Sequence, residues 1–178
     1  MQSIITSIIV AVGLSMDAFS LSILYGTLGL SIRKIILLSV VVGVFHFFMP
    51  IIGNLFGSLI TNYISVNLDI VVGLIFLVIA GEMIISLFKK EEVKSITGIA
   101  SLLLFGFTVS IDSFSVGIGL KALTNDIILT VSIFSIISLL FTFTGLLIGK
   151  KLNDIFGRIA TMIGGFILIG LGYVYIFL

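Results

Sequence analysis

The sequence contains no cysteine and no tryptophan, and it has a single proline, Pro50, in 178 residues. Without cysteine the chain cannot form a disulfide-stabilised scaffold or a thiolate metal site. Charge is scarce as well: charged residues make up 10% of the chain, whereas soluble domains carry roughly 25%. The net charge of +1 offers no basic surface to a nucleic acid. These shortages exclude a soluble enzyme domain, a nucleic-acid-binding protein and a disulfide-rich domain.

Hydrophobic residues, by contrast, make up 60% of the chain, and the mean hydropathy is +1.43. We therefore predict an all-α polytopic membrane protein with six transmembrane helices. Each apolar segment is long enough to cross ~30 Å of hydrocarbon, and none shows the alternation of a barrel strand. The first charge is Asp17, so the basic start of a secretory signal is missing and the first segment is expected to stay as a helix. The predicted helices cover residues 3–26, 35–63, 68–88, 99–120, 127–149 and 159–178.

The positive charges predict the orientation in the membrane. The second and fourth connections carry one basic residue, Lys121. The first, third and fifth carry eight, namely Arg33, Lys34, Lys89, Lys90, Lys94, Lys150, Lys151 and Arg158. Short connections rich in Lys and Arg stay in the cytoplasm. We therefore expect both termini on the outside of the cell membrane.

The chain also contains an internal repeat. The run Ser-Met-Asp-Ala-Phe-Ser at 15–20 matches Ser-Ile-Asp-Ser-Phe-Ser at 110–115, an offset of 95. Two glycine patterns repeat at offsets of 92 and 91: Gly53 and Gly57 with Gly145 and Gly149, and the 73–81 stretch with 164–172. Because each repeat would hold three helices, an odd number, the second copy must enter the membrane inverted. The predicted architecture is two inverted three-helix repeats, 1–94 and 95–178, with a substrate site near the midplane.

Asp17 and Asp112 are the strongest candidates for chemistry. Each lies well inside an apolar segment, where a carboxylate costs about 2.5–3.5 kcal/mol or more. Their equivalent places in the repeat would let them face each other, and opposed carboxylates bind a cation or protons. The alternative is a pair of protonated acids that join helices by a hydrogen bond worth only ~1 kcal/mol.

Four further side chains are candidates for the same site. Ser20 and Ser115 lie three residues after the two acids, on the same helix face, and could add ligand oxygens or only pack. Glu82 could be a third carboxylate, or it could extend toward the cytoplasm and pair with a lysine there. His46 could carry protons or bind a divalent metal. Its alternative is a neutral histidine that donates to a backbone carbonyl.

The two six-residue motifs, together with Pro50-Ile-Ile-Gly, Gly81-Glu-Met-Ile-Ile and the 164–170 run Gly-Gly-Phe-Ile-Leu-Ile-Gly, resemble the MntP family of manganese efflux pumps. Sporulation membrane proteins of the YtaF type are similar. The resemblance covers the whole chain and implies a bacterial protein of the cytoplasmic membrane that exports Mn²⁺, with Asp17 and Asp112 as the core acids. The chain departs from the family at His46, where Gln or Glu is common, and at Glu82, where a basic residue is common.

Taken together, we expect a secondary transporter and not an enzyme. No nucleotide-binding loop is present in the sequence, so exchange of Mn²⁺ for protons by alternating access is the simplest energy source. The expected partners are the lipid bilayer, a divalent metal ion and protons, and no cofactor is expected. Two alternatives stay open: transport of another divalent or a small organic cation, and a structural or sporulation role without transport. The predicted metal site comprises Asp17 and Asp112, with His46, Glu82, Ser20 and Ser115 as further candidates.

Overall fold

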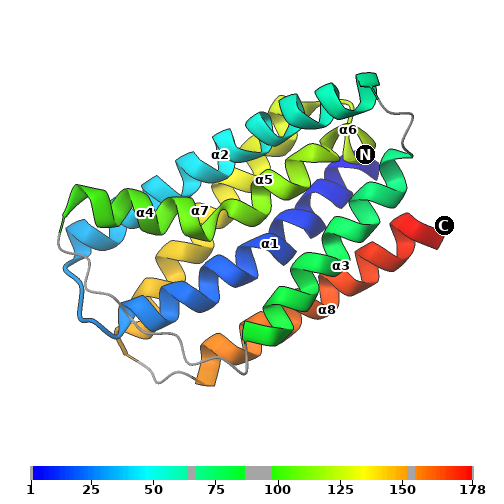
Figure 1. Cartoon of the computed structure of the whole chain (residues 1–178). Helices are drawn as coiled ribbons and strands as arrows, with labels where there is room; N and C mark the ends of the chain where they lie inside the picture. Colours follow the sequence, from blue (N-terminus) through cyan, green and yellow to red (C-terminus); the bar gives the residue numbers. More distant parts are fainter. Residues whose placement is uncertain (1, 64–66, 87–97, 152–154, 178) are drawn as a thin grey trace.

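The structure, a computed structural model of the chain, describes residues 2–63, 67–86, 98–151 and 155–177. Its regular structure in these ranges is entirely α-helical (Figure 1), as predicted. The helices are α1 (Gln2–Gly26), α2 (Ile32–Tyr63), α3 (Leu68–Ser86), α4 (Ile99–Val109), α5 (Ile111–Ile118), α6 (Leu120–Leu123), α7 (Ile127–Gly149) and α8 (Ile155–Phe177).

The fourth predicted helix is the main correction. We expected one continuous helix over 99–120, but α4 and α5 meet at an angle of 40°. At the break, the Ser110 amide donates to the Phe107 carbonyl, only three residues back. The Ser110 hydroxyl lies 2.7 Å from His46 Nδ1 on α2. A bond between distant helices leaves no trace in hydropathy, so the pattern could not predict this break. Two other helices begin earlier than expected, α2 at Ile32 and α8 at Ile155.

Three of the helices are long and apolar enough to cross a membrane: Ile4–Gly26, Ile32–Leu59 and Ile127–Gly149. The bent pair α4–α5 makes a fourth if it is one span. The apolar part of α8, Met162–Phe177, is shorter. Among the described residues, length and composition thus support three to four spans. Six crossings stay a prediction.

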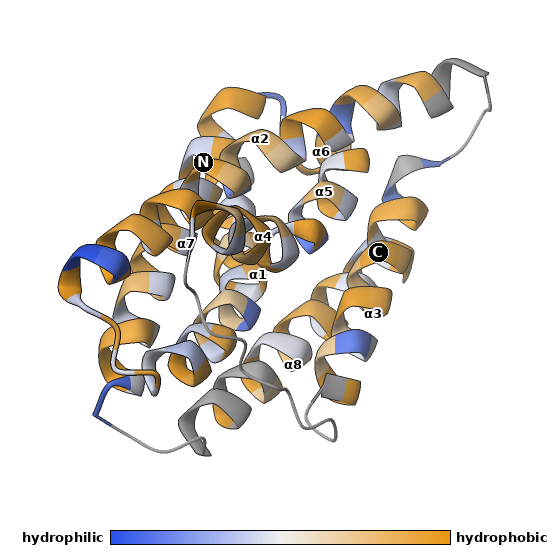
Figure 2. Cartoon of the chain, turned by 60° about the vertical axis from the view of Figure 1, so that its left-hand side comes forward, coloured by the Kyte–Doolittle hydropathy of each residue, from blue (hydrophilic) through white to orange (hydrophobic). Residues whose placement is uncertain are grey.

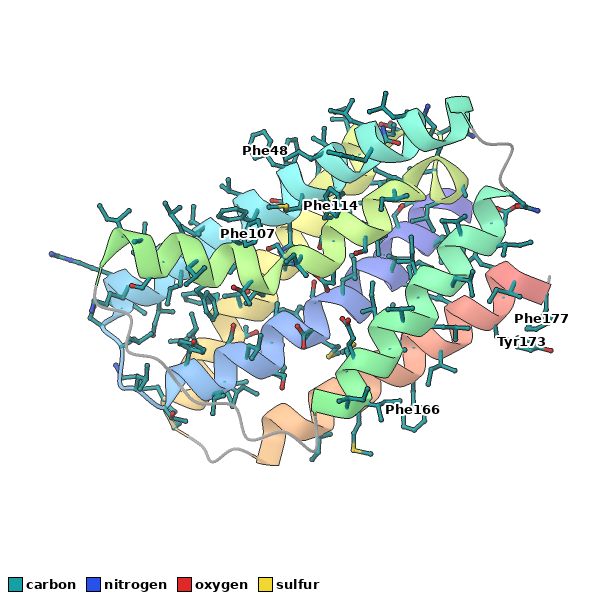
Figure 3. The ribbon with its side chains drawn as sticks, viewed as in Figure 1. Phe48, Phe107, Phe114, Phe166, Tyr173 and Phe177 are labelled. Atoms are coloured by element: carbon teal, nitrogen blue, oxygen red, sulfur yellow. The ribbon has the colours of Figure 1, made fainter. Side chains whose placement is uncertain are left out.

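The outer surface of the bundle is apolar. Figure 2 shows hydrophobic residues along the outside of the helices. In Figure 3 the labelled side chains of α8, Phe166, Tyr173 and Phe177, point away from the bundle, and they are 66%, 58% and 69% exposed. Phe48 of α2 also points outward and is 54% exposed. Soluble proteins rarely expose so much contiguous apolar surface, whereas lipid tails solvate it well.

The helices of the first half pack mainly against helices of the second half. α1 lies along α7, α2 lies along α5 and α7, and α3 lies along α8. Two buried bonds join α1 to α7: Ser7 Oγ lies 3.0 Å from Thr130 Oγ1, and Ser15 Oγ lies 2.8 Å from Ser138 Oγ. Because the residue numbers of the bonded partners rise together along the two helices, α1 and α7 run parallel. The largest core side chains, Phe76 of α3 and Phe134 of α7, are fully buried.

Glycines bring two of these helix pairs into backbone contact. A Cβ added at any of four glycines would collide with a carbonyl of the neighbouring helix. On α7, Gly145 and Gly149 meet the carbonyls of Phe19 and Ile23 of α1, and on α2, Gly53 and Gly57 meet those of Phe114 and Ile118 of α5. Small residues allow such close helix packing in membranes. The two sets of contacts fall on positions that the repeated motifs relate to each other.

Both termini lie at the same end of the bundle (Figure 1), while α2 begins and α7 ends at the opposite end. Arg33 and Lys34 at the start of α2, and Lys150 and Lys151 just after α7, therefore mark the end away from the termini. Of the other basic residues on which the orientation was predicted, Lys89, Lys90, Lys94 and the side chain of Arg158 lie outside the described part.

Candidate cation site

Asp17 lies on the side of α1 that meets α8. Two other residues of this side define it: a Cβ on Gly13 would lie 3.1 Å from Leu168 of α8, and Met16 lies against Gly164 of α8. Residues 13, 16, 17 and 20 share one face of a helix because of their spacing. Asp17 and Ser20 therefore occupy the face that meets α8, and both are half-buried.

Asp112 lies in the first turn of α5, directly after the break at Ser110. Its Oδ1 accepts a hydrogen bond from the Ser113 amide at 2.7 Å. Its Oδ2 is buried and has no hydrogen-bond partner among the described residues. The start of a helix favours a negative charge. A buried carboxylate oxygen without a donor is nevertheless costly unless a proton or a cation satisfies it.

Two other acids act on Asp112. The charge of Asp17 on α1 and, more weakly, the charge of Glu82 on α3 reach the Asp112 carboxyl on α5. Glu82 is exposed on α3. Like charges in an apolar surrounding repel strongly, and the region therefore attracts positive charge. A metal site shared by Asp17 and Asp112, with Glu82 as a third acid, stays a prediction.

His46 lies elsewhere. It is fully buried on α2, and its Nδ1 contacts the Val42 carbonyl at 3.0 Å and the Ser110 hydroxyl at 2.7 Å. Nε2 is buried without a hydrogen-bond partner in the described part of the chain. The imidazole thus contacts a backbone carbonyl, as expected for a histidine with a structural role. It also joins α2 to the break before Asp112.

The face of α5 that meets α2 differs from the face that carries Asp112. Ser110 contacts His46, and the backbones of Phe114 and Gly117 meet α2. These positions recur at intervals of four and three along one side, and Asp112 falls outside the series. Asp112, on which the charges of Asp17 and Glu82 act, therefore lies off the side of α5 that meets His46.

Ser20 and Ser115 are half-buried. Within the described residues, no group of three or more His, Cys, Asp or Glu side chains is close enough to hold a metal ion. The two aspartates would therefore need oxygen or sulfur ligands of other types to complete the coordination of a divalent ion.

Sequence reasoning missed the parts played by Ser15 and Ser110, which were not among the candidate residues. Ser15 bonds Ser138 of α7, and Ser110 bonds His46 of α2. The repeat contained a signal for this pairing, because Ser110 follows Ser15 by 95 residues and Ser138 follows His46 by 92. The same polar contact thus occurs twice, once with a histidine and once with a serine.

Comparison with known proteins places the chain in a family. A family model described as "Putative manganese efflux pump" (MntP) matches residues 29–176. A protein named "Putative manganese efflux pump MntP" from Bacillus pumilus (strain SAFR-032) is 36% identical over 98% of this chain and 95% of its own length. Relatives with the same name from Bacillus thuringiensis subsp. konkukian (strain 97-27) and Bacillus cereus (strain Q1) are 36% identical over 99% of this chain and 97% of theirs.

No solved structure matches the chain. The family match covers the α2, α3 and α5 regions that hold His46, Glu82 and Asp112, and the relatives extend it to Asp17 in α1. The family is one of membrane transporters and not of enzymes. On its own composition, on its helical structure and on these full-length similarities, the chain is a multi-pass membrane protein of bacterial type and belongs to the MntP family.

Proposed function

We propose that this protein exports Mn²⁺ from the bacterial cytoplasm in exchange for protons. The observation that carries the proposal is the buried Asp112 Oδ2, which has no hydrogen-bond partner among the described residues and on which the charges of Asp17 and Glu82 act. Acids at membrane depth are costly and are usually kept for ion pathways. The relatives are named as manganese efflux pumps, which suggests manganese as the substrate and export as the direction.

The ligand chemistry supports Mn²⁺ and protons as the two ions that share the site. Carboxylate and hydroxyl oxygens suit Mn²⁺, and Ser20 and Ser115 share helix faces with Asp17 and Asp112. A carboxylate can hold a metal or a proton but not both. Metal release on one side of the membrane is therefore coupled to proton uptake at the same oxygens. In this proposal Glu82 and His46 are not the core ligands: they lie on the route of the ion to the site or hold the surrounding helices in position.

We infer further that the chain crosses the membrane six times as two inverted repeats, 1–94 and 95–178. Three observations support this: the matched glycine contacts of the two helix pairs, the matched polar contacts of Ser15 and Ser110, and both termini at one end. With the basic residues in the cytoplasm, both termini face outward. Alternating access then exposes the acids first to one side and then to the other.

The test measures Mn²⁺ flux into liposomes that contain the purified protein, with a pH gradient applied. Asp17→Asn and Asp112→Asn should each abolish flux at unchanged protein abundance, because Asn keeps the volume but removes the charge. Asp126→Asn is a matched control: Asp126 is exposed and caps α7 through the Leu129 amide at 3.0 Å, and Asn caps as well as Asp. Flux at the wild-type rate in either intramembrane variant would disprove the shared site.

The same liposomes separate the alternatives. If the wild type carries another divalent or a small organic cation and not Mn²⁺, the substrate assignment is wrong and the site stands. If it carries no cation under any gradient, and cells with the double Asn variant show no change in metal tolerance, the structural role is the better description.

A further inference from the structure

Two methionines meet over a glycine beside the acidic region. A Cβ added to Gly164 of α8 would lie 2.5 Å from Met16 Cβ of α1 and 2.6 Å from Met83 Cε of α3. The absence of a side chain at Gly164 is therefore what lets both methionines approach this point on α8. Met83 is 3% exposed, and its methyl group is bonded directly to the sulfur. The thioether thus lies in the contact between α3 and α8.

Each methionine directly neighbours one of the three acids. Met16 precedes Asp17 and shares with it the side of α1 that meets α8. Met83 follows Glu82 on α3, and the charges of Asp17 and Glu82 both reach Asp112. α1 and α3 therefore each carry an acid next to a methionine; the two methionines meet at Gly164, and the charges of both acids act on Asp112 of α5.

Carboxylates alone discriminate poorly among divalent ions of this kind, because Mg²⁺, Ca²⁺ and Mn²⁺ all accept hard oxygen ligands. A thioether is a soft, neutral ligand that suits softer metals and is a poor substitute for water on Mg²⁺ or Ca²⁺. The chain has no cysteine, and His46 lies on the α2 side of α5. Methionine is thus the soft donor that stands next in sequence to Asp17 and to Glu82.

We propose that Met83, with Met16 beside it, determines the ion specificity of the site by favouring Mn²⁺ and softer divalent ions over Mg²⁺ and Ca²⁺. The inference rests on the proposed function, since it assigns the selectivity of the same site. The thioether would act against the wrong ions as much as for the right one. Replacing a water on Mg²⁺ or Ca²⁺ with a thioether weakens the binding of that ion, and specificity is the difference between the affinity for Mn²⁺ and the affinity for its competitor.

Packing is the other reading of these side chains, because methionine often fills gaps in a core. Met83→Leu separates the two readings. Leucine has a similar volume and such exchanges cost little stability, but it has no sulfur. A packing role predicts an unchanged preference among ions, whereas a ligand role predicts an altered preference in a folded protein. Met162→Leu is the control, since Met162 is 46% exposed on the outside of α8.

The experiment uses the full-length protein in two assays. The first measures equilibrium binding of Mn²⁺, read from its paramagnetic resonance, in competition with Mg²⁺ and Ca²⁺, and the second measures Mn²⁺ and Cd²⁺ flux in liposomes. We expect Met83→Leu, and more strongly Met16→Leu with Met83→Leu, to lower the preference for Mn²⁺ over Ca²⁺ by about tenfold, a loss of about 1.4 kcal/mol of discrimination. The flux of Cd²⁺, the softest of these ions, should fall the most.

An unchanged Mn²⁺-to-Ca²⁺ preference in the double variant would overturn the proposal, as would an equal change in Met162→Leu. If Met83→Leu does not fold, the Mn²⁺-to-Ca²⁺ preference of the single Met16→Leu variant tests the proposal in its place. Failure of the proposed function gives a different result: the wild type would bind Mn²⁺ selectively and carry none of it across the liposome membrane.

Discussion

The close approach of helix backbones at Gly53 and Gly145 gives a prediction whose size follows from the structure. A Cβ on Gly145 of α7 would lie 2.7 Å from the Phe19 carbonyl oxygen and 2.8 Å from Ser22 Cβ of α1. Ordinary contacts of a Cβ begin at 3.4 Å. The helices would have to separate by several tenths of an ångström to admit alanine. On α2, a Cβ at Gly53 would overlap the Phe114 carbonyl more severely.

We therefore expect Gly53→Ala to destabilise the protein more than Gly145→Ala. Overpacking of a well-packed contact costs about 1–3 kcal/mol, which for a chain of this length corresponds to roughly 2–12 °C in melting temperature. The measurement is the melting temperature of the purified variants in one detergent, followed by size-exclusion chromatography. Because the obstacle at Gly53 is backbone, a rotamer change cannot relieve it.

Gly170→Ala is the matched control, because a Cβ at Gly170 on α8 would meet nothing within 4 Å. Alanine is also the better helix former by about 1 kcal/mol, so this variant should melt at or slightly above the wild-type temperature. Equal melting temperatures for Gly53→Ala and Gly170→Ala would refute the argument that backbone contact between α2 and α5 stabilises the bundle.

Two further predictions concern the topology and the side chains of His46 and Glu82. A reporter that fluoresces only in the cytoplasm should stay dark when fused after Leu178 and should fluoresce when inserted between Lys90 and Glu91; a bright C-terminal fusion would contradict the orientation or the number of crossings. His46→Ala and Glu82→Gln should each reduce Mn²⁺ export while equilibrium metal binding persists, since the first removes the bond to Ser110 at the α4–α5 break and the second removes a charge that acts on Asp112. Complete loss of binding would make that residue a direct ligand, and export at the wild-type rate in both variants would leave neither with a part in transport.

Hydropathy predicted the helices of this protein well because one physical cause, an apolar surrounding, determines them. The bounds of α1, α3 and α7 agree with the prediction within two residues over the described part of the chain. The break at Ser110 could not be predicted in this way, because its cause is not local in the sequence. It coincides with a bond to His46, 64 residues away in the sequence, and a window of neighbouring residues contains no information about such a partner.

The acids of the site were predictable because a charge is out of place in an apolar segment wherever it occurs. Asp17 and Asp112 stood out in this way, and the repeat predicted that they meet. Met16 and Met83 did not stand out, because a methionine is ordinary in such a helix. Their significance depends on which face meets α8, and adjacent residues of a helix differ by about 100° in direction. The contact with Gly164 provides that information.

The units that repeat in the sequence are not the units that pack. α1 lies against α7 through Ser15, Gly145 and Gly149, and α2 lies against α5 through His46, Gly53 and Gly57, so each close pair joins the first half of the chain to the second. A movement of residues 1–94 as one rigid body against 95–178 would have to break both sets of backbone contacts at once. The proposed alternating access must instead keep each pair intact and shift α2 along α7, against which it also packs. In such a movement Asp17 would travel with α7 and Asp112 with α2. The distance between the two carboxylates, and with it the affinity for a shared cation, would then change.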